Sequence, residues 1–88
     1  MSNKKYEYSY NINANVNEKD FFMCCKLIEK GLPGILKEEL LIDVDGSLIQ
    51  MYNYMGKEIA VYDDYYVDAV YVDSNVNLEK IIGKKSVY

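Results

Sequence analysis

The most informative segment of this chain for its architecture is Leu40-Leu41-Ile42-Asp43-Val44-Asp45-Gly46-Ser47-Leu48-Ile49. Two apolar runs flank Asp45-Gly46, and Asp-Gly between such runs is the strongest short-range signal for a β-hairpin. We expect a two-residue loop, with Val44 paired to Ser47, Ile42 to Ile49 and Leu40 to Met51. In this register one face of the hairpin is apolar and would pack against a helix, whereas a slip of one residue would exchange the two faces.

The same stretch resembles the first motif of the haloacid-dehalogenase phosphatases, a hydrophobic strand that ends in Asp-x-Asp-Gly-Thr/Ser. The resemblance implies that Asp43 is a nucleophile, that Asp63-Asp64 serve a magnesium ion, and that the sheet is doubly wound and parallel. Parallel strands need crossovers of a dozen or more residues. Residues 47–74 read as successive strands with no crossover helix, so the hairpin interpretation is favoured. The stretch does not fit an EF-hand calcium loop, because Leu41 and Tyr52 occupy the positions where that loop needs Asp and a bidentate Glu.

Length and composition indicate one folded domain over residues 1–88. Apolar residues make up 50% of the chain and charged residues 27%, which is typical of globular proteins. No apolar stretch has the length of a membrane span, and the polar start leads into no signal-peptide core. We therefore expect a cytoplasmic protein without membrane contact.

Several chemistries lack the residues that they need. Cys24 and Cys25 are adjacent and there is no other cysteine, so a disulfide framework is excluded. The chain has no His, which removes the commonest metal ligand and general base. We expect no metal, no cofactor and no catalytic residue.

The charge pattern points away from nucleic acid. The net charge is −4, whereas direct nucleic-acid binding requires a basic patch. All ten basic residues are Lys, so no Arg fork is available for phosphate recognition. The absence of Arg beside many Asn, Ile and Tyr suggests an AT-rich genome, such as that of a low-GC bacterium, its phages or its mobile elements.

The first half of the chain predicts a strand and a helix. Residues 5–13 alternate with period two and predict a strand. Asn15 or Asn17 is expected to cap the start of a helix. We expect Gly31 to be the left-handed residue that directly follows this helix. The helical stripe expected in the core consists of Phe21, Cys24, Cys25, Ile28 and Leu32.

The second half predicts further strands after the hairpin, at 58–62 and 65–73, with a turn at Asp63-Asp64 and a short helix over 75–82. The predicted fold is α+β: a single domain of order β-α-β-β-β-β-α, with a largely antiparallel four- or five-stranded sheet and one main helix packed on one face. One helix cannot cover such a sheet. We expect the far face to be partly open and to carry Tyr.

Tyrosine and aspartate are the residues that suggest a surface for a partner. Ten Tyr stand beside two Phe and no Trp: Tyr6, Tyr8, Tyr10, Tyr52, Tyr54, Tyr62, Tyr65, Tyr66, Tyr71 and Tyr88. Tyr suits protein interfaces, although cross-strand packing is an alternative role. The candidate partner-binding residues combine turn, charge and aromatic anchors within seven positions: Tyr62, Asp63, Asp64, Tyr65, Tyr66 and Asp68.

Three functions remain open. The first is a small acidic, non-enzymatic binding protein that occupies a basic surface of a larger protein, as a phage or mobile-element inhibitor of a nucleic-acid-binding partner would. The second is an accessory or structural homodimer of a low-GC bacterium. The third is a small enzyme that uses the carboxylates of Asp43, Asp45, Asp63 and Asp64.

Overall fold

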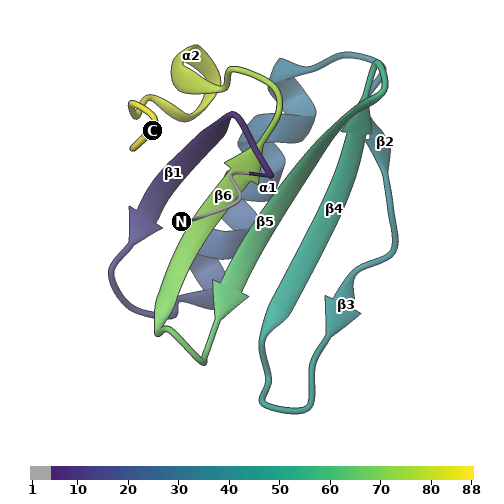
Figure 1. Ribbon diagram of the computed structural model, residues 1–88. Coiled ribbons are helices and arrows are strands. Elements are labelled where there is room, and N and C mark those ends of the chain that lie inside the picture. Colours follow the sequence, from purple (N-terminus) through teal and green to yellow (C-terminus); the bar gives the residue numbers. More distant parts are fainter. Residues whose placement is uncertain (1–4) are drawn as a thin grey trace.

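The computed structural model describes residues 5–88, which form one antiparallel sheet with a helix on one face (Figure 1). The elements in chain order are β1 (Tyr8–Asn13), α1 (Glu18–Gly31), β2 (Leu36–Lys37), β3 (Leu41–Ile42), β4 (Leu48–Tyr54), β5 (Lys57–Asp64), β6 (Ala69–Ser74) and α2 (Glu79–Ile82). The strand order is β1-β6-β5-β4, and β2 and β3 both pair with the outer side of β4. All pairs are antiparallel. The predicted α+β fold with a largely antiparallel sheet and one main helix is confirmed, and the parallel sheet of the phosphatases is excluded. The sheet has six strands rather than four or five, because the short strand β2 was not predicted.

The main helix α1 begins as predicted. The Asn17 side chain accepts a hydrogen bond of 3.0 Å from the Asp20 amide and caps the helix. The acidic residues Glu18 and Asp20 lie in the first turn, where their negative charge interacts favourably with the positive end of the helix dipole. The predicted stripe of Phe21, Cys24, Cys25, Ile28 and Leu32 is buried against the sheet.

The end of α1 differs from the prediction at Gly31. Gly31 is the last residue of the helix and Leu32 is its cap, so Gly31 is not a left-handed residue beyond the helix. A Cβ at Gly31 would lie 2.8 Å from Cγ1 of Ile81. Glycine at this position therefore allows α2 to approach α1 closely.

The hairpin register is one residue from the one expected. Leu41 pairs with Ile49 and Ile42 with Leu48, because the turn has three residues between Asp43 and Ser47 rather than two. The Gly46 amide donates to the Asp43 carbonyl, and the Asp43 amide donates to the Ser47 carbonyl. Gly46 alone in this turn has positive φ, at 93°, so the type I′ turn that needs two such residues is not formed.

This slip exchanges the two faces of β4 relative to the segment before the turn, where Leu40 still packs against the core as expected. Leu48 and Tyr52 are buried with the core, whereas Ile42 and Val44 are 70% and 104% exposed. Ile49 and Met51 of the expected apolar face instead alternate with the buried Leu48 and Tyr52 and lie on the other face of β4. The physical reason is the pairing of β4 with β5, which sets Tyr52 beside the buried Ile59.

The Tyr residues divide between the two faces of the sheet. Tyr10 and Tyr52 are fully buried, and Tyr8 and Tyr54 pack against the same core under α1. The expectation that Tyr marks the far face is wrong for these four. Tyr62 and Tyr71 pair on the opposite face, because their neighbours Val61 and Val72 belong to the core and side chains alternate along a strand.

The last strand is shorter than predicted. Residues 65–68 form the turn between β5 and β6 rather than the start of a strand, and Asp63-Asp64 end β5 rather than forming the turn. Helix α2 covers four residues of the predicted segment 75–82 and ends at Gly83, whose φ is 80°. Within residues 5–88, no helix has the length and apolar character needed to cross a membrane.

Candidate protein-binding surface

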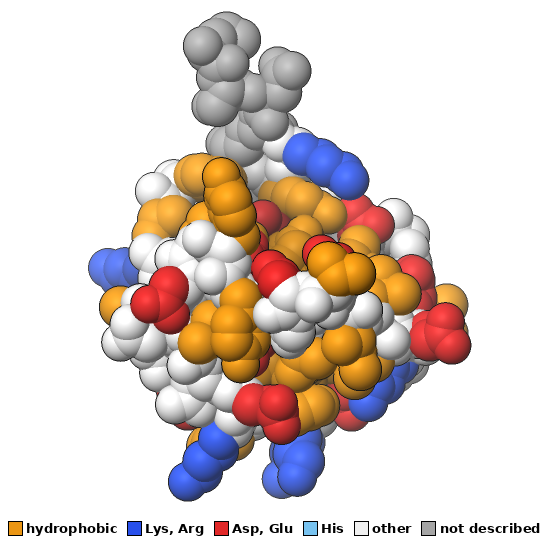
Figure 2. Space-filling view, turned by 90° about the horizontal axis from the view of Figure 1, so that it is seen from below, with side chains coloured by type: hydrophobic (Ala, Val, Ile, Leu, Met, Phe, Trp, Pro, Cys, Tyr) orange, Lys and Arg blue, Asp and Glu red, His pale blue; other side chains and the backbone are white. Residues whose placement is uncertain are grey.

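Two turns lie side by side at one end of the sheet: residues 43–46 between β3 and β4, and residues 65–68 between β5 and β6. The Tyr65 amide donates a hydrogen bond of 2.8 Å to Oγ of Ser47. A Cβ at Gly46 would lie 3.8 Å from the Tyr65 ring. We call the exposed side chains of these two turns the turn surface. Seen from this end, hydrophobic side chains gather in a broad patch broken by carboxylates, with lysines at the rim (Figure 2).

The turn surface contains four exposed apolar side chains. Val44 is fully exposed, Tyr66 is 90% exposed, and Tyr65 and Val67 are each about half exposed. Tyr65 and Tyr66 follow each other in the chain, yet neither is buried in the core. Solvent-exposed apolar side chains that cluster at neighbouring turns form a surface suited to a partner protein.

The aspartates at this end fix the shape of the turns. Oδ1 of Asp64 accepts hydrogen bonds from the amides of Tyr66 and Val67, and its Oδ2 accepts one of 2.8 Å from the Tyr71 hydroxyl. Asp68, with φ of 56°, accepts the Val16 amide at 3.0 Å. This amide lowers the pKa of the Asp68 carboxyl.

Asp63 does not belong to the surface. It is 1% exposed, and its Oδ1 accepts the Asn17 amide at 2.9 Å. Asp63 therefore connects the end of β5 to the start of α1, and its expected exposure is wrong. Among the six predicted residues, Tyr65, Tyr66 and Asp68 are exposed, and Asp64 is partly buried.

Tyr62 lies away from the turn surface, on the open face of the sheet. It is partly buried and stacks on Tyr71 with ring centroids 4.6 Å apart. Burial, followed by the hydrogen bond to Asp64, raises the pKa of Tyr71. Ile49 pairs with Tyr62 across the strands, so an apolar row crosses the open face.

Val44 and Val67 are functional candidates that sequence reasoning missed. Val44 was expected on the apolar face of the hairpin, and Val67 within a strand. Gly46 could have indicated the exposure of Val44. A three-residue loop that ends in a positive-φ glycine is the next most common hairpin connection after the two-residue loop. That alternative would have exposed Val44.

The four carboxylates considered for an enzyme are all engaged in local structure. Asp45 accepts the Ser47 amide at 2.9 Å, which lowers the pKa of its carboxyl. Asp43 accepts the Val44 amide, and Asp63 and Asp64 accept the bonds given above. Among residues 5–88, no three potential ligands are grouped so that they could hold a metal ion.

The comparisons with known proteins give no relative. No family model matches the chain, and no curated protein or solved structure is significantly similar to it.

Proposed function

We propose that this protein is a small acidic binding module that occupies a basic surface of a larger protein and catalyses no reaction. The observation that carries the proposal is the turn surface, where Val44, Tyr66 and Val67 are exposed on loops fixed by hydrogen bonds. Apolar side chains on preorganised loops lose little conformational freedom on binding, which favours affinity. Aromatic residues are also typical interface anchors.

The charge of the chain suggests the kind of partner. The net charge is −4, and Asp43, Asp45 and Asp68 are exposed beside the apolar side chains of the turns. Such a surface is attracted to a basic groove, including one that holds nucleic acid, and its association is faster at low salt. An inhibitor encoded by a phage or mobile element is the role that fits these properties. Free cysteines in the core suit action in the reducing cytoplasm.

The test is affinity capture of a partner with the wild type and matched variants. Tyr66→Ala and Val44→Ser remove exposed apolar groups from the turn surface, and Met55→Asn is the control. Met55 is 85% exposed in the β4–β5 turn, at the other end of the sheet. We expect the first two variants to weaken binding by about tenfold or more, as truncation of an interface anchor does. Retention of full affinity by both would contradict the proposal.

An accessory homodimer is the second candidate, because the open face carries an apolar row. The Tyr62 and Tyr71 rings stack there, and Ile49 and Met51 are partly exposed beside them. Solution mass at low micromolar concentration separates the two functions. A dimer that Tyr62→Ser dissociates would favour the structural role, and a monomer would favour the binding module.

A further inference from the structure

The two edges of the sheet differ in whether another segment of the chain covers them. At the β1 edge the C-terminal segment covers the strand: the Ser9 amide donates to Oγ of Ser86, and the Val87 amide donates to the Ser9 carbonyl at 2.8 Å. At the other edge, β2 and β3 pair only with β4 within residues 5–88. An uncovered edge offers unpaired backbone groups to another strand.

The backbone of β3 has the geometry for such pairing. The Asp43 amide bonds to the Ser47 carbonyl at 2.9 Å, and hydrogen-bonded and non-bonded residues alternate in an antiparallel pair. The amide and carbonyl of Ile42 therefore point away from β4, toward solvent. The side chains of Leu41 and Ile42 are 49% and 70% exposed.

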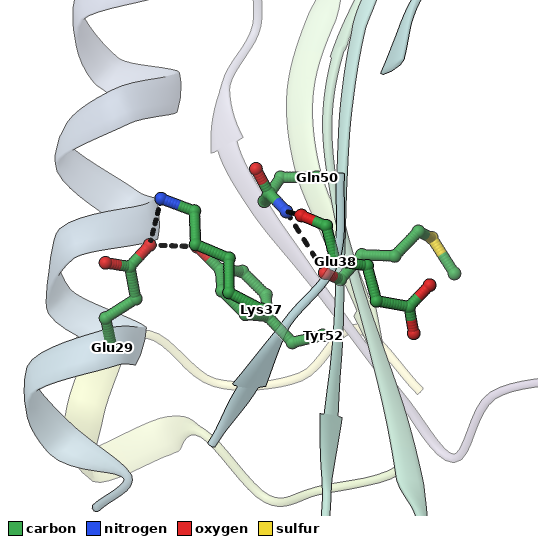
Figure 3. Close-up of polar contacts among 6 residues, drawn as sticks. Glu29, Lys37, Glu38, Gln50 and Tyr52 are labelled. Carbon is green, nitrogen blue, oxygen red and sulfur yellow. Dashed lines mark hydrogen bonds and ion pairs between the residues drawn. The ribbon is translucent and has the colours of Figure 1, made fainter. Parts of the chain in front are cut away.

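Lys37 and Glu38, which precede β3, are bound by residues of β4 and α1. The Glu38 amide donates to the Met51 carbonyl, and Nε2 of Gln50 donates to the Glu38 carbonyl at 2.6 Å (Figure 3). Lys37 forms an ion pair of 3.1 Å with Glu29 of α1, so this lysine is engaged on the helix side. These contacts hold Lys37 and Glu38 against β4 and α1, whereas Leu41 and Ile42 of β3 stay exposed at the edge.

Charge surrounds the exposed part of the edge. Glu38 and Glu39 precede β3, Asp43 and Asp45 follow it, and all four are exposed. The apolar centre of this edge is thus flanked by carboxylates on both sides. A strand with an apolar centre and basic residues at both ends is complementary to it.

We propose that β3 accepts such an extended segment of the partner protein by strand addition, which continues the sheet. This inference rests on the proposed function and identifies the partner's binding element. A second copy of this chain fits poorly: antiparallel pairing centred on Leu41 sets Glu39 opposite Asp43 of the other copy. Like charges in that position are destabilising.

The test uses defined peptides, so it is independent of partner capture. The probe is a capped Lys-Lys-Val-Thr-Val-Lys-Lys peptide. One control carries Glu in place of Lys, and the other keeps every side chain but is N-methylated at alternate residues. Binding to the isotopically labelled protein is followed by amide chemical shifts and hydrogen exchange. We expect the probe to slow hydrogen exchange of the Ile42 amide by about tenfold or more. Neither control peptide should slow this exchange.

Variants at Ile42 separate backbone pairing from side-chain contact. Ile42→Pro removes the outward amide, which is tolerated at a sheet edge, and Ile42→Thr keeps the amide while reducing apolar contact. We expect Pro to abolish probe binding and Thr to retain most of it, with both variants folded by circular dichroism. If Ile42→Pro is unfolded, protection of the Ile42 amide in the wild type decides the question.

Several results would overturn strand addition. They are equal binding of the N-methylated peptide, shifts confined to residues 65–67, or no binding of the probe. Concentration-dependent protection of Ile42 without peptide would instead show self-association at this edge and would also overturn it. If capture still depends on Tyr66 in any of these cases, the proposed function stands and only the strand-addition inference fails.

Discussion

The buried carboxylate of Asp63 accepts a hydrogen bond of 2.9 Å from the Asn17 amide and thereby ties the end of β5 to the start of α1. The Asn17 side chain in turn caps the helix through the Asp20 amide. This pair fixes the end of the sheet that also carries the turn surface. Asp63, which the sequence predicted at an exposed turn, therefore has a structural role.

Replacing Asp63 with Ala is expected to lower the free energy of unfolding by about 1–3 kcal/mol, because the Asn17 amide loses its acceptor. Asp63→Asn should cost less, since its amide oxygen can still accept. Asp43→Asn serves as the control at an exposed turn position and should change stability by less than about 0.5 kcal/mol. Denaturant melts measure all three, and equal stability of Asp63→Ala and wild type would contradict the structural role.

Gly46→Val should destabilise the β3–β4 turn, because Gly46 has φ of 93° and β-branched residues resist this conformation. The expected loss is about 1–2 kcal/mol. Gly46→Asn should cost less, since Asn tolerates positive φ better than Val. The order of thermal midpoints, with Val below Asn and Asn below wild type, checks the prediction.

Core truncations in α1 should be costly. Phe21 and Ile28 are fully buried, so Phe21→Ala or Ile28→Ala is expected to cost about 2–5 kcal/mol. Leu27 is 45% exposed on the outer side of the same helix, and Leu27→Ala is the matched control, with a loss below about 1 kcal/mol. A reversal of this order in urea melts would mean that the helix packs through its other face.

The two thiols should react slowly in the native protein. Burial raises the pKa of Cys24 to about 12 and that of Cys25 to about 11, and the thiolate is the reactive form. Labelling by a thiol reagent at pH 8 should be accelerated strongly by denaturant. Fast labelling of both residues without denaturant would contradict their burial.

The same groups predict loss of stability in alkali. A raised pKa in the folded state means that the unfolded chain releases its protons first, so stability falls as pH rises. For Cys25 this loss runs from its ordinary pKa of 9.0 to about 11. Burial raises the pKa of Tyr52 in the same direction. Denaturant melts from pH 7 to pH 11 should show a falling free energy of unfolding above pH 9, and Cys25→Ala should reduce the slope.

Local features of the chain could be predicted because they depend on neighbouring residues. The Asn17 cap and the stripe from Phe21 to Leu32 follow from helical periodicity and capping chemistry. The hairpin at Gly46 was located correctly, but its loop length was not. Asp-Gly is compatible with loops of two or three residues, and the choice between them changes which face is buried.

Residues that interact across the chain could not be assigned in this way. Asp63 meets Asn17 across 46 positions, and its turn-like sequence context gives no sign of burial. Gly31 looked like a helix stop, and only the structure shows that a Cβ there would force Ile81 to shift. Tyr10 and Tyr66 are identical in type, yet one is fully buried and the other 90% exposed.

The fold class, the helix and its buried stripe could be predicted from the amino-acid sequence, because periodicity and capping act within a few residues. The hairpin register, the burial of Asp63 and the exposure of Val44 and Tyr66 became visible only in the folded chain. These depend on which strands pair and on what α1 covers, so distant parts of the chain set them. The candidate binding surface belongs to this second group, since two separate turns must meet to form it.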